Sequence, residues 1–176
     1  MVTGAGGPSA TATGSATETA RAIVATVLDP EVPVLTIADL GILRDVTVDE
    51  TGHVDVTITP TYSGCPAMDA IRSDVRSALS GQGFDDVEVR LVLSPAWTTD
   101  WIGDSGRRKL LDYGIAPPQP RAPVVGDGPI ALTLSVRCPR CGSPDTRELS
   151  RFASTACKSL WACNACAEPF DHFKAH

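Results

Sequence analysis

Two pairs of closely spaced cysteines place the tightest constraint on what this chain can fold into. Cys138 and Cys141 form one C-x-x-C knuckle, Cys163 and Cys166 form a second, and 21 residues separate the two. Tetrahedral zinc takes four thiolates, and knuckles at two hairpin tips can supply them. A unit of about forty residues cannot hold itself together by core burial, so a bound metal would supply much of its folding free energy. We therefore predict a C-terminal β zinc ribbon over residues 132–176.

Four thiolates alone do not fix the metal of this ribbon. The same ligands suit structural zinc, which is our first expectation, but also iron or an iron–sulfur cluster. Two disulfides are less expected, because we assign the chain to the reducing cytoplasm. Cys157 is left over. It is either a small buried residue or an alternative metal ligand.

The stretch from Thr59 to Met68 joins a predicted strand to a predicted helix and carries one cysteine, Cys65. Pro66 suits the first helical position, because its missing N–H is not needed there, and this puts Cys65 at the N-cap. Unpaired N–H groups and the positive end of the helix dipole favour thiolate over thiol. We therefore predict a presented cysteine with a lowered pKa.

Hydrophobic periodicity gives the order of elements around this loop. The first helix begins at a capping box and ends at Asp29-Pro30, since the residue before proline avoids the α region. Alternating apolar residues then indicate a hairpin and, after a second amphipathic helix, a third strand. The resulting α-β-β-α-β order predicts an α+β domain with its helices on one face of a short sheet. The expected elements are a helix from the Ser15/Glu18 capping box, strands over 41–48 and 54–59, a helix over 66–80 and a strand over 87–93.

Composition divides the chain into four parts. Residues 1–16 are rich in Gly, Ala, Ser and Thr and lack the basic and apolar regions of a signal peptide, so we expect a disordered leader. Prolines and glycines in 114–131 indicate a semi-rigid linker. The first domain would then span 17–113 and the ribbon 132–176.

The charge and hydropathy of the chain argue against two classes of partner. No stretch approaches the roughly 18 to 20 apolar residues that span a bilayer, so we expect a cytoplasmic protein without a membrane contact. The net charge is −6, which repels nucleic acid. The ribbon also lacks the interleaved aromatic and basic residues of a stacking platform. We therefore expect no nucleic-acid partner.

Two carboxylates follow the first helix in the segment Asp29-Pro30-Glu31-Val32-Pro33-Val34. One interpretation is a helix stop followed by an extended linker. The other is that Asp29 and Glu31 form a polar lip beside the Cys65 loop. Both interpretations stay open at this point.

Several motifs together carry a family resemblance that covers the chain after about residue 16. The motifs are Asp29-Pro30-Glu31-Val32-Pro33, Asp39-Leu40-Gly41, Thr61-Tyr62-Ser63-Gly64-Cys65-Pro66, Pro95-Ala96-Trp97-Thr98-Thr99-Asp100-Trp101-Ile102 and Gly106-Arg107-Arg108-Lys109-Leu110, followed by the ribbon and Ser154-Thr155-Ala156-Cys157-Lys158. With these motifs the chain resembles the PaaD family, accessory subunits of the phenylacetyl-CoA epoxidase system, whose N-terminal domain is similar to iron–sulfur carrier and assembly domains of the SufT type.

This resemblance implies a role in phenylacetate catabolism. The epoxidase is a multicomponent ring 1,2-epoxidase, fed by a reductase with a [2Fe-2S] centre that the accessory subunit would mature or maintain. Cys65 would be the reactive cysteine, and Asp29 and Glu31 would match an acidic motif at the same cofactor-binding site. The implied partners are the reductase and the oxygenase components.

The residues themselves suit a carrier better than a catalyst. One thiolate cannot hold an iron–sulfur cluster alone, so a partner or a second copy in a homodimer would complete the coordination. A nucleophilic Cys65 would need a base, and the only histidines are His53, His172 and His176. We therefore expect no independent catalysis. The alternatives are a buried structural Cys65 and a structural adaptor that docks an oxygenase component through Trp97 and Trp101.

Overall fold

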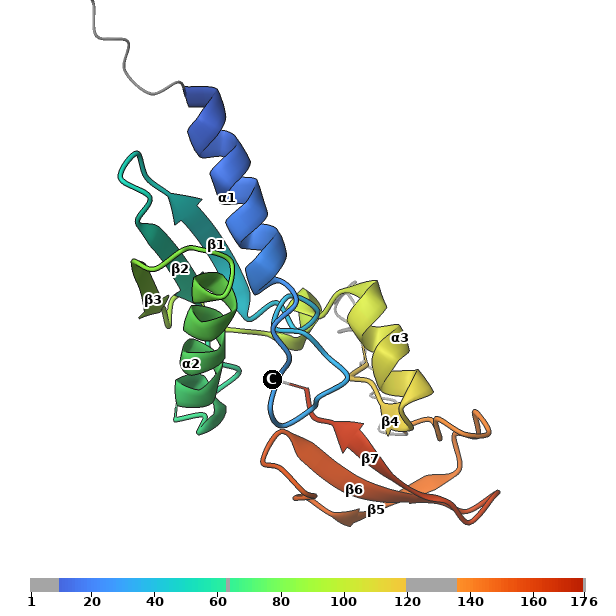
Figure 1. Cartoon of the computed structure of the whole chain (residues 1–176). Coiled ribbons are helices and arrows are strands. Elements are labelled where there is room, and N and C mark those ends of the chain that lie inside the picture. The colour runs from blue at the N-terminus through green and yellow to red at the C-terminus, as the bar shows by residue number, and fades with distance from the viewer. Residues whose placement is uncertain (1–9, 63, 120–135, 176) are drawn as a thin grey trace, which may run out of the picture. The chain divides into compact units, whose positions relative to one another are not determined.

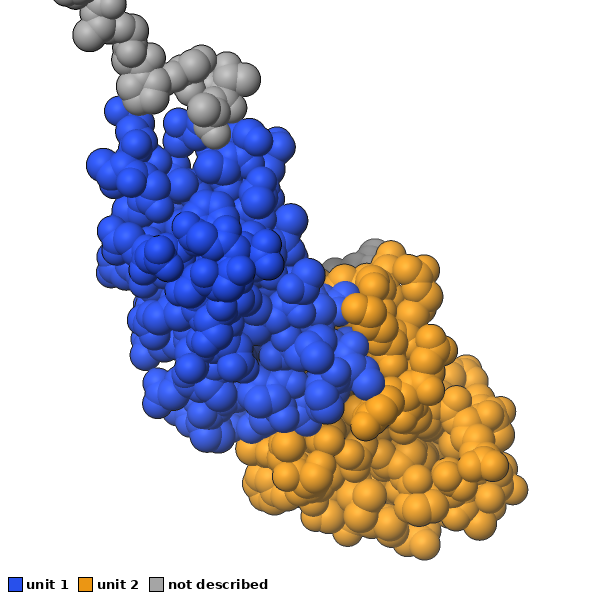
Figure 2. Space-filling view, viewed as in Figure 1, with its two compact units in different colours: residues 1–97 blue, residues 98–176 orange. Residues whose placement is uncertain are grey.

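The computed structural model describes residues 10–62, 64–119 and 136–175 (Figure 1). The first nine residues of the expected leader and most of the expected linker lie outside these ranges. The chain divides into two compact units, residues 1–97 and 98–176, which Figure 2 shows in different colours. In the described ranges no helix is both long and apolar enough to cross a bilayer.

The first unit has the predicted α-β-β-α-β order. Strands β1 and β2 form an antiparallel hairpin, and β3 pairs with β2 in parallel, so the sheet order is β1-β2-β3. Parallel neighbours need a long crossover, and α2 supplies it. The elements are α1 (Ala10–Val24), β1 (Leu43–Val48), β2 (Val54–Ile58), α2 (Ala67–Ser80) and β3 (Val87–Leu91).

The core of this unit lies between the sheet and the two helices. Alternate residues of β2 are fully buried, whereas Asp55 and Thr57 between them are partly exposed. Figure 1 shows α1 and α2 against the three-stranded sheet, and the two helices also contact each other. The helices therefore cover one face, as predicted. Their fully buried side chains include Ala20, Val24, Ile71, Val75 and Leu79.

Helix α1 begins earlier than the sequence pattern indicated. It starts at Ala10, so part of the expected leader 1–16 is helical and Ser15 lies inside the helix instead of capping it. The carbonyl of Ser15 accepts a bond of 2.9 Å from the Thr19 hydroxyl. Thr17 ties the helix to the sheet, because its hydroxyl accepts a bond of 3.1 Å from the amide of Val48.

The second unit is built on a four-stranded sheet of order β4-β7-β6-β5. Strands β5, β6 and β7 are antiparallel neighbours, and the two-residue strand β4 pairs with β7 in parallel. Its small core contains Phe170, Cys138 and Cys163, with Trp161 packed against them. The elements are η1 (Thr99–Trp101), α3 (Asp104–Asp112), β4 (Ile115–Ala116), β5 (Thr146–Ser150), β6 (Lys158–Cys163) and β7 (Pro169–Phe173).

The boundary between the units differs from the expected one. We expected the first domain to continue to residue 113, but the compact units divide after Trp97, which places α3 in the second unit. Ile115 and Ala116, assigned to the linker, pair with Asp171 and His172 of β7. A two-residue strand has no periodicity of its own, so this long-range pairing could not be predicted from the pattern.

Candidate functional sites

The Cys65 loop connects the end of β2 to the start of α2. The amide of Cys65 donates to the carbonyl of Tyr62 at 3.2 Å, and the amide of Met68 donates to the carbonyl of Cys65 at 3.3 Å. Gly64 has a φ of 89°, a left-handed conformation that favours glycine. The N-cap of α2 is Pro66 and not Cys65, so the predicted position of the cysteine was wrong by one residue.

The surroundings of Cys65 raise the pKa of its thiol. Burial has the largest effect, and the negative charges of Glu31 and Asp29 also raise the pKa. Hydrogen bonds from the Ala67 amide and the Thr61 hydroxyl lower it, but they are outweighed. The predicted lowered pKa was therefore wrong, because the side chain is only 9% exposed and lies near two carboxylates. At neutral pH the group is a thiol.

Asp29 and Glu31 lie close enough to act electrostatically on Cys65. Asp29 is buried, and its Oδ1 accepts bonds from the amides of Glu31 at 2.9 Å and Val32 at 2.7 Å. Its own amide donates to the carbonyl of Leu35 at 2.9 Å. The carboxylate therefore stabilises the turn after α1 and also contributes charge to the cysteine site. The first interpretation was wrong in part, because α1 ends at Val24 and residues 30–35 form bends and turns, not an extended linker. The polar lip formed by Asp29 and Glu31 stays a prediction.

These three residues do not form a preformed metal site. Across the described ranges, the one group of three or more His, Cys, Asp or Glu side chains that could hold an ion is the cysteine cluster of the second unit. The charges of Asp29 and Glu31 act on Cys65, but the ligand atoms of these three side chains do not converge on one point. A ligand at Cys65 would therefore need further donors from elsewhere.

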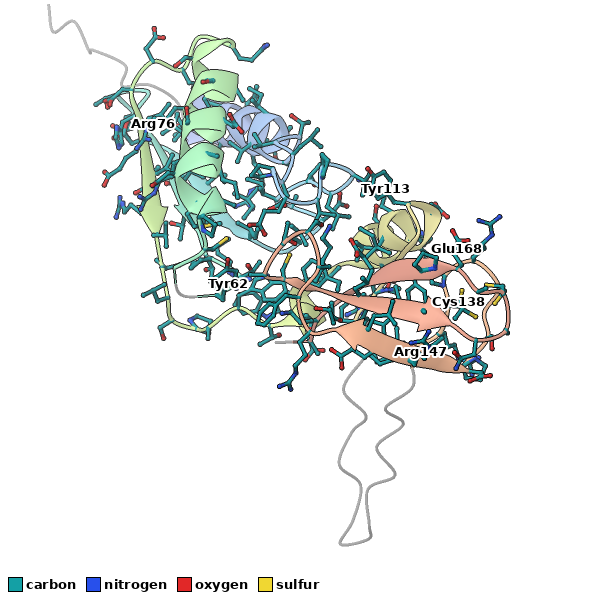
Figure 3. The ribbon with its side chains drawn as sticks, turned by 90° about the horizontal axis from the view of Figure 1, so that it is seen from below. Tyr62, Arg76, Tyr113, Cys138, Arg147 and Glu168 are labelled. Carbon is teal, nitrogen blue, oxygen red and sulfur yellow. The ribbon has the colours of Figure 1, made fainter. Side chains whose placement is uncertain are left out.

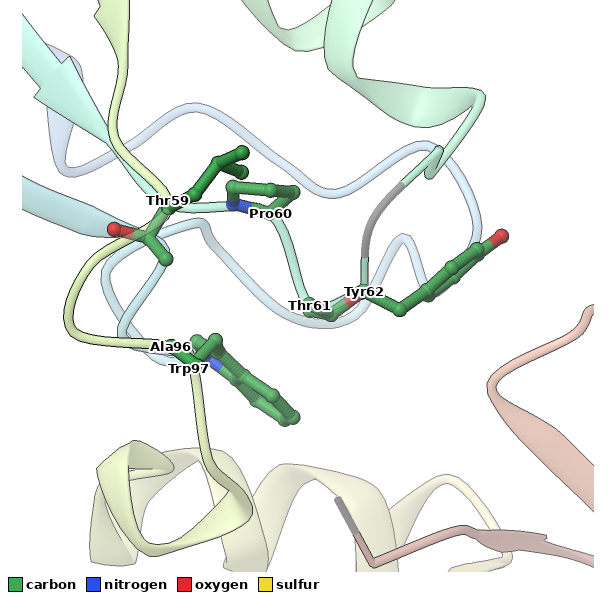
Figure 4. Close-up of a pocket in the computed structure, with 7 residues that line it drawn as sticks. Thr59, Pro60, Thr61, Tyr62, Ala96 and Trp97 are labelled. Carbon is green, nitrogen blue, oxygen red and sulfur yellow. The ribbon is translucent and has the colours of Figure 1, made fainter.

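A cavity that the sequence did not predict lies beside the Cys65 loop (Figure 4). It has a volume of about 190 Å³ and is partly open to solvent. The buried Trp97 closes one side and donates from its indole nitrogen to the carbonyl of Leu40 at 2.8 Å. The buried hydroxyl of Thr59 has no hydrogen-bond partner among the described residues. The cavity is lined by Thr59, Pro60, Thr61, Tyr62, Leu93, Ala96 and Trp97.

The four ribbon cysteines converge on one point, as their spacing predicted. All four Sγ atoms lie within 4.8 Å of one another. The Cys138 and Cys166 sulfurs are 3.8 Å apart, and those of Cys141 and Cys163 are 3.6 Å apart. A zinc ion bound tetrahedrally at about 2.3 Å from each sulfur would separate the sulfurs by roughly 3.8 Å. The site therefore fits zinc, and Figure 3 shows Cys138 and Glu168 at the same end of the sheet.

Crowding of these sulfurs spreads their pKa values apart. Hydrogen bonds lower the pKa of the Cys163 thiol to about 7, and the bond from the amide of Cys166 has the largest effect. The amide of Glu168 lowers the pKa of Cys166, but burial and the three neighbouring thiols raise it overall to about 12. Protons therefore leave this cluster in widely separated steps. A divalent metal binds thiolates and releases the protons together.

The other candidate ligand, Cys157, and the described histidines have local partners of their own. Cys157 is buried, with its sulfur 3.0 Å from the Thr155 hydroxyl, which favours the structural interpretation. His53 pairs with Asp86 at 3.0 Å and lies at the start of β2, opposite the end that leads to Cys65. Nδ1 of His172 is 3.3 Å from the Ser159 hydroxyl. His176 lies outside the described residues.

Comparison with known proteins supports both units. The family described as "Iron-sulfur cluster assembly protein" matches residues 17–91, and the one described as "PaaD zinc beta ribbon domain" matches residues 126–174. The chain is 49% identical over 154 residues to a protein of Escherichia coli (strain K12) that is named as part of a "Putative 1,2-phenylacetyl-CoA epoxidase". That similarity covers 87% of this chain and 89% of the E. coli protein. The chain belongs to the PaaD family.

Two further comparisons concern the first unit of this PaaD-family chain. It is 39% identical over 77 residues to the "Fe-S protein maturation auxiliary factor SufT" of Staphylococcus aureus (strain USA300), which covers 43% of this chain and 86% of that protein. A solved domain of unknown function, DUF59 from Bacillus anthracis, matches with a TM-score of 0.54 and 31% identity. That match covers 58% of this chain and 97% of the solved one. The predicted family resemblance is confirmed.

Proposed function

We propose that this PaaD-family chain is a non-catalytic accessory protein that matures or maintains the iron–sulfur centre of the phenylacetyl-CoA epoxidase system. The observation that carries the proposal is the placement of Cys65. It is the one cysteine of a unit that matches iron–sulfur assembly proteins, two carboxylates act on its thiol, and residues of its loop line an open cavity. The similarity to a protein named as part of an epoxidase supports the choice of client.

In this proposal Cys65 binds an iron or iron–sulfur cargo as one of several ligands. The cation displaces the proton of the thiol, because a metal ion bound to sulfur deprotonates it. The charges of Asp29 and Glu31 then favour the bound cation, although without it they disfavour the thiolate. One thiolate cannot saturate a cluster, so the client or a second copy of the chain supplies the other ligands. Binding is therefore transient and suits transfer.

The ribbon has a structural role in this proposal. Cys138, Cys141, Cys163 and Cys166 hold zinc, which joins the two knuckles and adds folding free energy to a small core. The proposed partners are the reductase and the oxygenase components in the cytoplasm. The alternative of an adaptor that docks through Trp97 and Trp101 loses Trp97 as an exposed anchor, because this side chain is buried and bonded to Leu40. Trp101 is partly exposed, so its part in docking stays a prediction.

Metal analysis of anaerobically purified protein tests the assignment of the two sites. Wild type and Cys65→Ala are loaded with iron and sulfide, and zinc, iron and acid-labile sulfide are measured. We expect one zinc per chain in both proteins and loss of iron and sulfide in the variant only. Equal iron and sulfide in both proteins would contradict the role of Cys65, and loss of zinc in the variant would contradict the separation of the sites.

A further inference from the structure

The cavity beside the Cys65 loop has the size and walls of a site for one apolar group. Its volume is about 190 Å³, and an engineered cavity of about 150 Å³ binds benzene. Pro60, Leu93, Ala96 and Trp97 provide apolar walls. The unpaired hydroxyl of Thr59 adds one buried polar atom to the lining. A ring-sized apolar group with a polar edge would fit this composition.

The cavity is connected to Cys65 through a shared residue. Thr61 lines the cavity, and its hydroxyl is also close enough to the Cys65 thiol to lower the pKa of that group. Figure 4 shows Thr61 and Tyr62 on the loop that leads to the cysteine, with Ala96 and Trp97 on the facing segment. At the rim, Leu93 is 63% exposed and Ala96 is also exposed. A molecule bound here would therefore lie beside Cys65.

Charge decides what kind of molecule can approach. The first unit contains five basic and thirteen acidic residues, a net charge of −8. The seven described residues that line the cavity are neutral, and Glu31 and Asp29 act on the adjacent cysteine. An acyl-CoA carries several phosphates and would be repelled, although an acyl ring would fit by size. A protein segment that carries lysine or arginine beside an apolar side chain would be attracted.

We propose that this cavity is the docking site for the client of the proposed function. It takes a ring-sized apolar side chain on a basic surface segment of an epoxidase component, and it holds that component beside Cys65. This inference rests on the proposed function for the identity of the client. Docking itself needs the cavity and the negative field, and it does not need the thiol.

Binding of purified epoxidase components to the full-length chain tests the inference. Ala96→Leu fills the cavity from an exposed position, and Ala70→Leu adds the same group at an exposed position of α2. We expect Ala96→Leu to weaken binding of one component at least 10-fold and Ala70→Leu to leave it unchanged. Raising the salt concentration should weaken wild-type binding. Unchanged binding by Ala96→Leu, or no binding by wild type, would overturn the docking site.

A second pair of measurements separates this inference from the proposed function. In the absence of iron and sulfide, Cys65→Ala should bind the component as tightly as wild type, since the thiol is not part of the cavity lining and no cargo bridges it to the component. If it binds normally and also restores the client's cluster normally, the proposed function fails and the docking site stands. Phenylacetyl-CoA should neither bind the free chain nor compete with the component. Competition that Ala96→Leu abolishes would overturn the protein-docking proposal in favour of a small ligand.

Discussion

Cys65 is 9% exposed although both of its chain neighbours, Gly64 and Pro66, are exposed. The loop therefore brings the backbone to the surface while the sulfur stays mostly covered. Burial and the nearby Glu31 and Asp29 keep the thiol protonated at neutral pH. This arrangement protects the group from oxidants, which react with thiolates, while leaving a metal able to displace the proton.

At this scale we predict that Glu31→Gln lowers the pKa of the Cys65 thiol relative to wild type. The substitution removes a negative charge that disfavours the thiolate. The measurement is the pH dependence of alkylation at Cys65, quantified by mass spectrometry on zinc-loaded protein. Glu50→Gln, in the exposed turn between β1 and β2, is the control and should change nothing. An unchanged or raised pKa in Glu31→Gln would contradict the electrostatic role of this carboxylate.

The roles of Cys65, Asp29 and Glu31 stay predictions. Cys65 was singled out by its place between a strand and a helix, and Asp29 and Glu31 were joined to it by the family resemblance. The thiol pKa was predicted in the wrong direction, because burial depends on how distant segments pack over the loop. The cavity was missed for the same reason. Its walls come from 59–62 and 93–97, and only the fold brings these two segments together.

Among the elements, the ribbon sheet depends most on a ligand. Its core is small, and two of the core residues, Cys138 and Cys163, are themselves metal ligands in our proposal. Strand β5 is exposed along almost its whole length and contributes little burial. Such a unit gains much of its folding free energy from the metal.

We predict that removing zinc unfolds the ribbon and leaves the first unit folded. The first unit has its own core between its helices and sheet, which contains no metal ligand of the cluster. Hydrogen exchange after chelation should show protection lost in β5, β6 and β7 and kept in β2 and α2. Protection that persists throughout the ribbon would show that the metal is dispensable for folding. Readdition of zinc should restore the exchange pattern.

His172 of β7 should make the second unit sensitive to acid. Burial lowers its pKa to about 4 from an ordinary value of 6.5, so the folded state holds fewer protons. The contribution of His172 to the free energy of unfolding is fully present above pH 6.5 and is lost progressively as the pH falls toward 4. After allowing for partial exposure of the side chain, the loss is about 2 kcal/mol. The difference in unfolding free energy between wild type and His172→Gln should therefore shrink with acid. The comparison is made over the pH range in which both proteins keep their zinc, since we expect its loss to unfold β7. A pH-independent difference over that range would contradict this prediction.

Helices and strands whose apolar residues recur at a regular spacing were predicted well, and those without such a spacing were not. The hairpin, α2 and β3 follow from alternation and helical spacing, and the structure has all of them in the predicted order. The start of α1 was placed too late, because the capping box at Ser15 lies inside a helix that continues toward the N-terminus. Strand β4 has two residues and depends wholly on pairing with β7, so no local pattern could reveal it.

The whole molecule separates its charge between its two units. The first carries a net charge of −8, whereas the second holds ten basic and eight acidic residues, a net of +2. In our account the acidic unit attracts a basic client and a cationic cargo, and the ribbon has a zinc-stabilised fold of its own. From this proposed division of roles we predict that Cys65 is dispensable for folding and for docking but essential for the client's cluster.

The most direct test is the [2Fe-2S] occupancy of the reductase in cells that express the epoxidase system with wild type, Cys65→Ala or no accessory chain. Occupancy is measured per reductase polypeptide, at equal amounts of the two accessory chains. We predict high occupancy with wild type and low occupancy with Cys65→Ala, close to the value without the chain. Occupancy with Cys65→Ala equal to that of wild type would contradict the account.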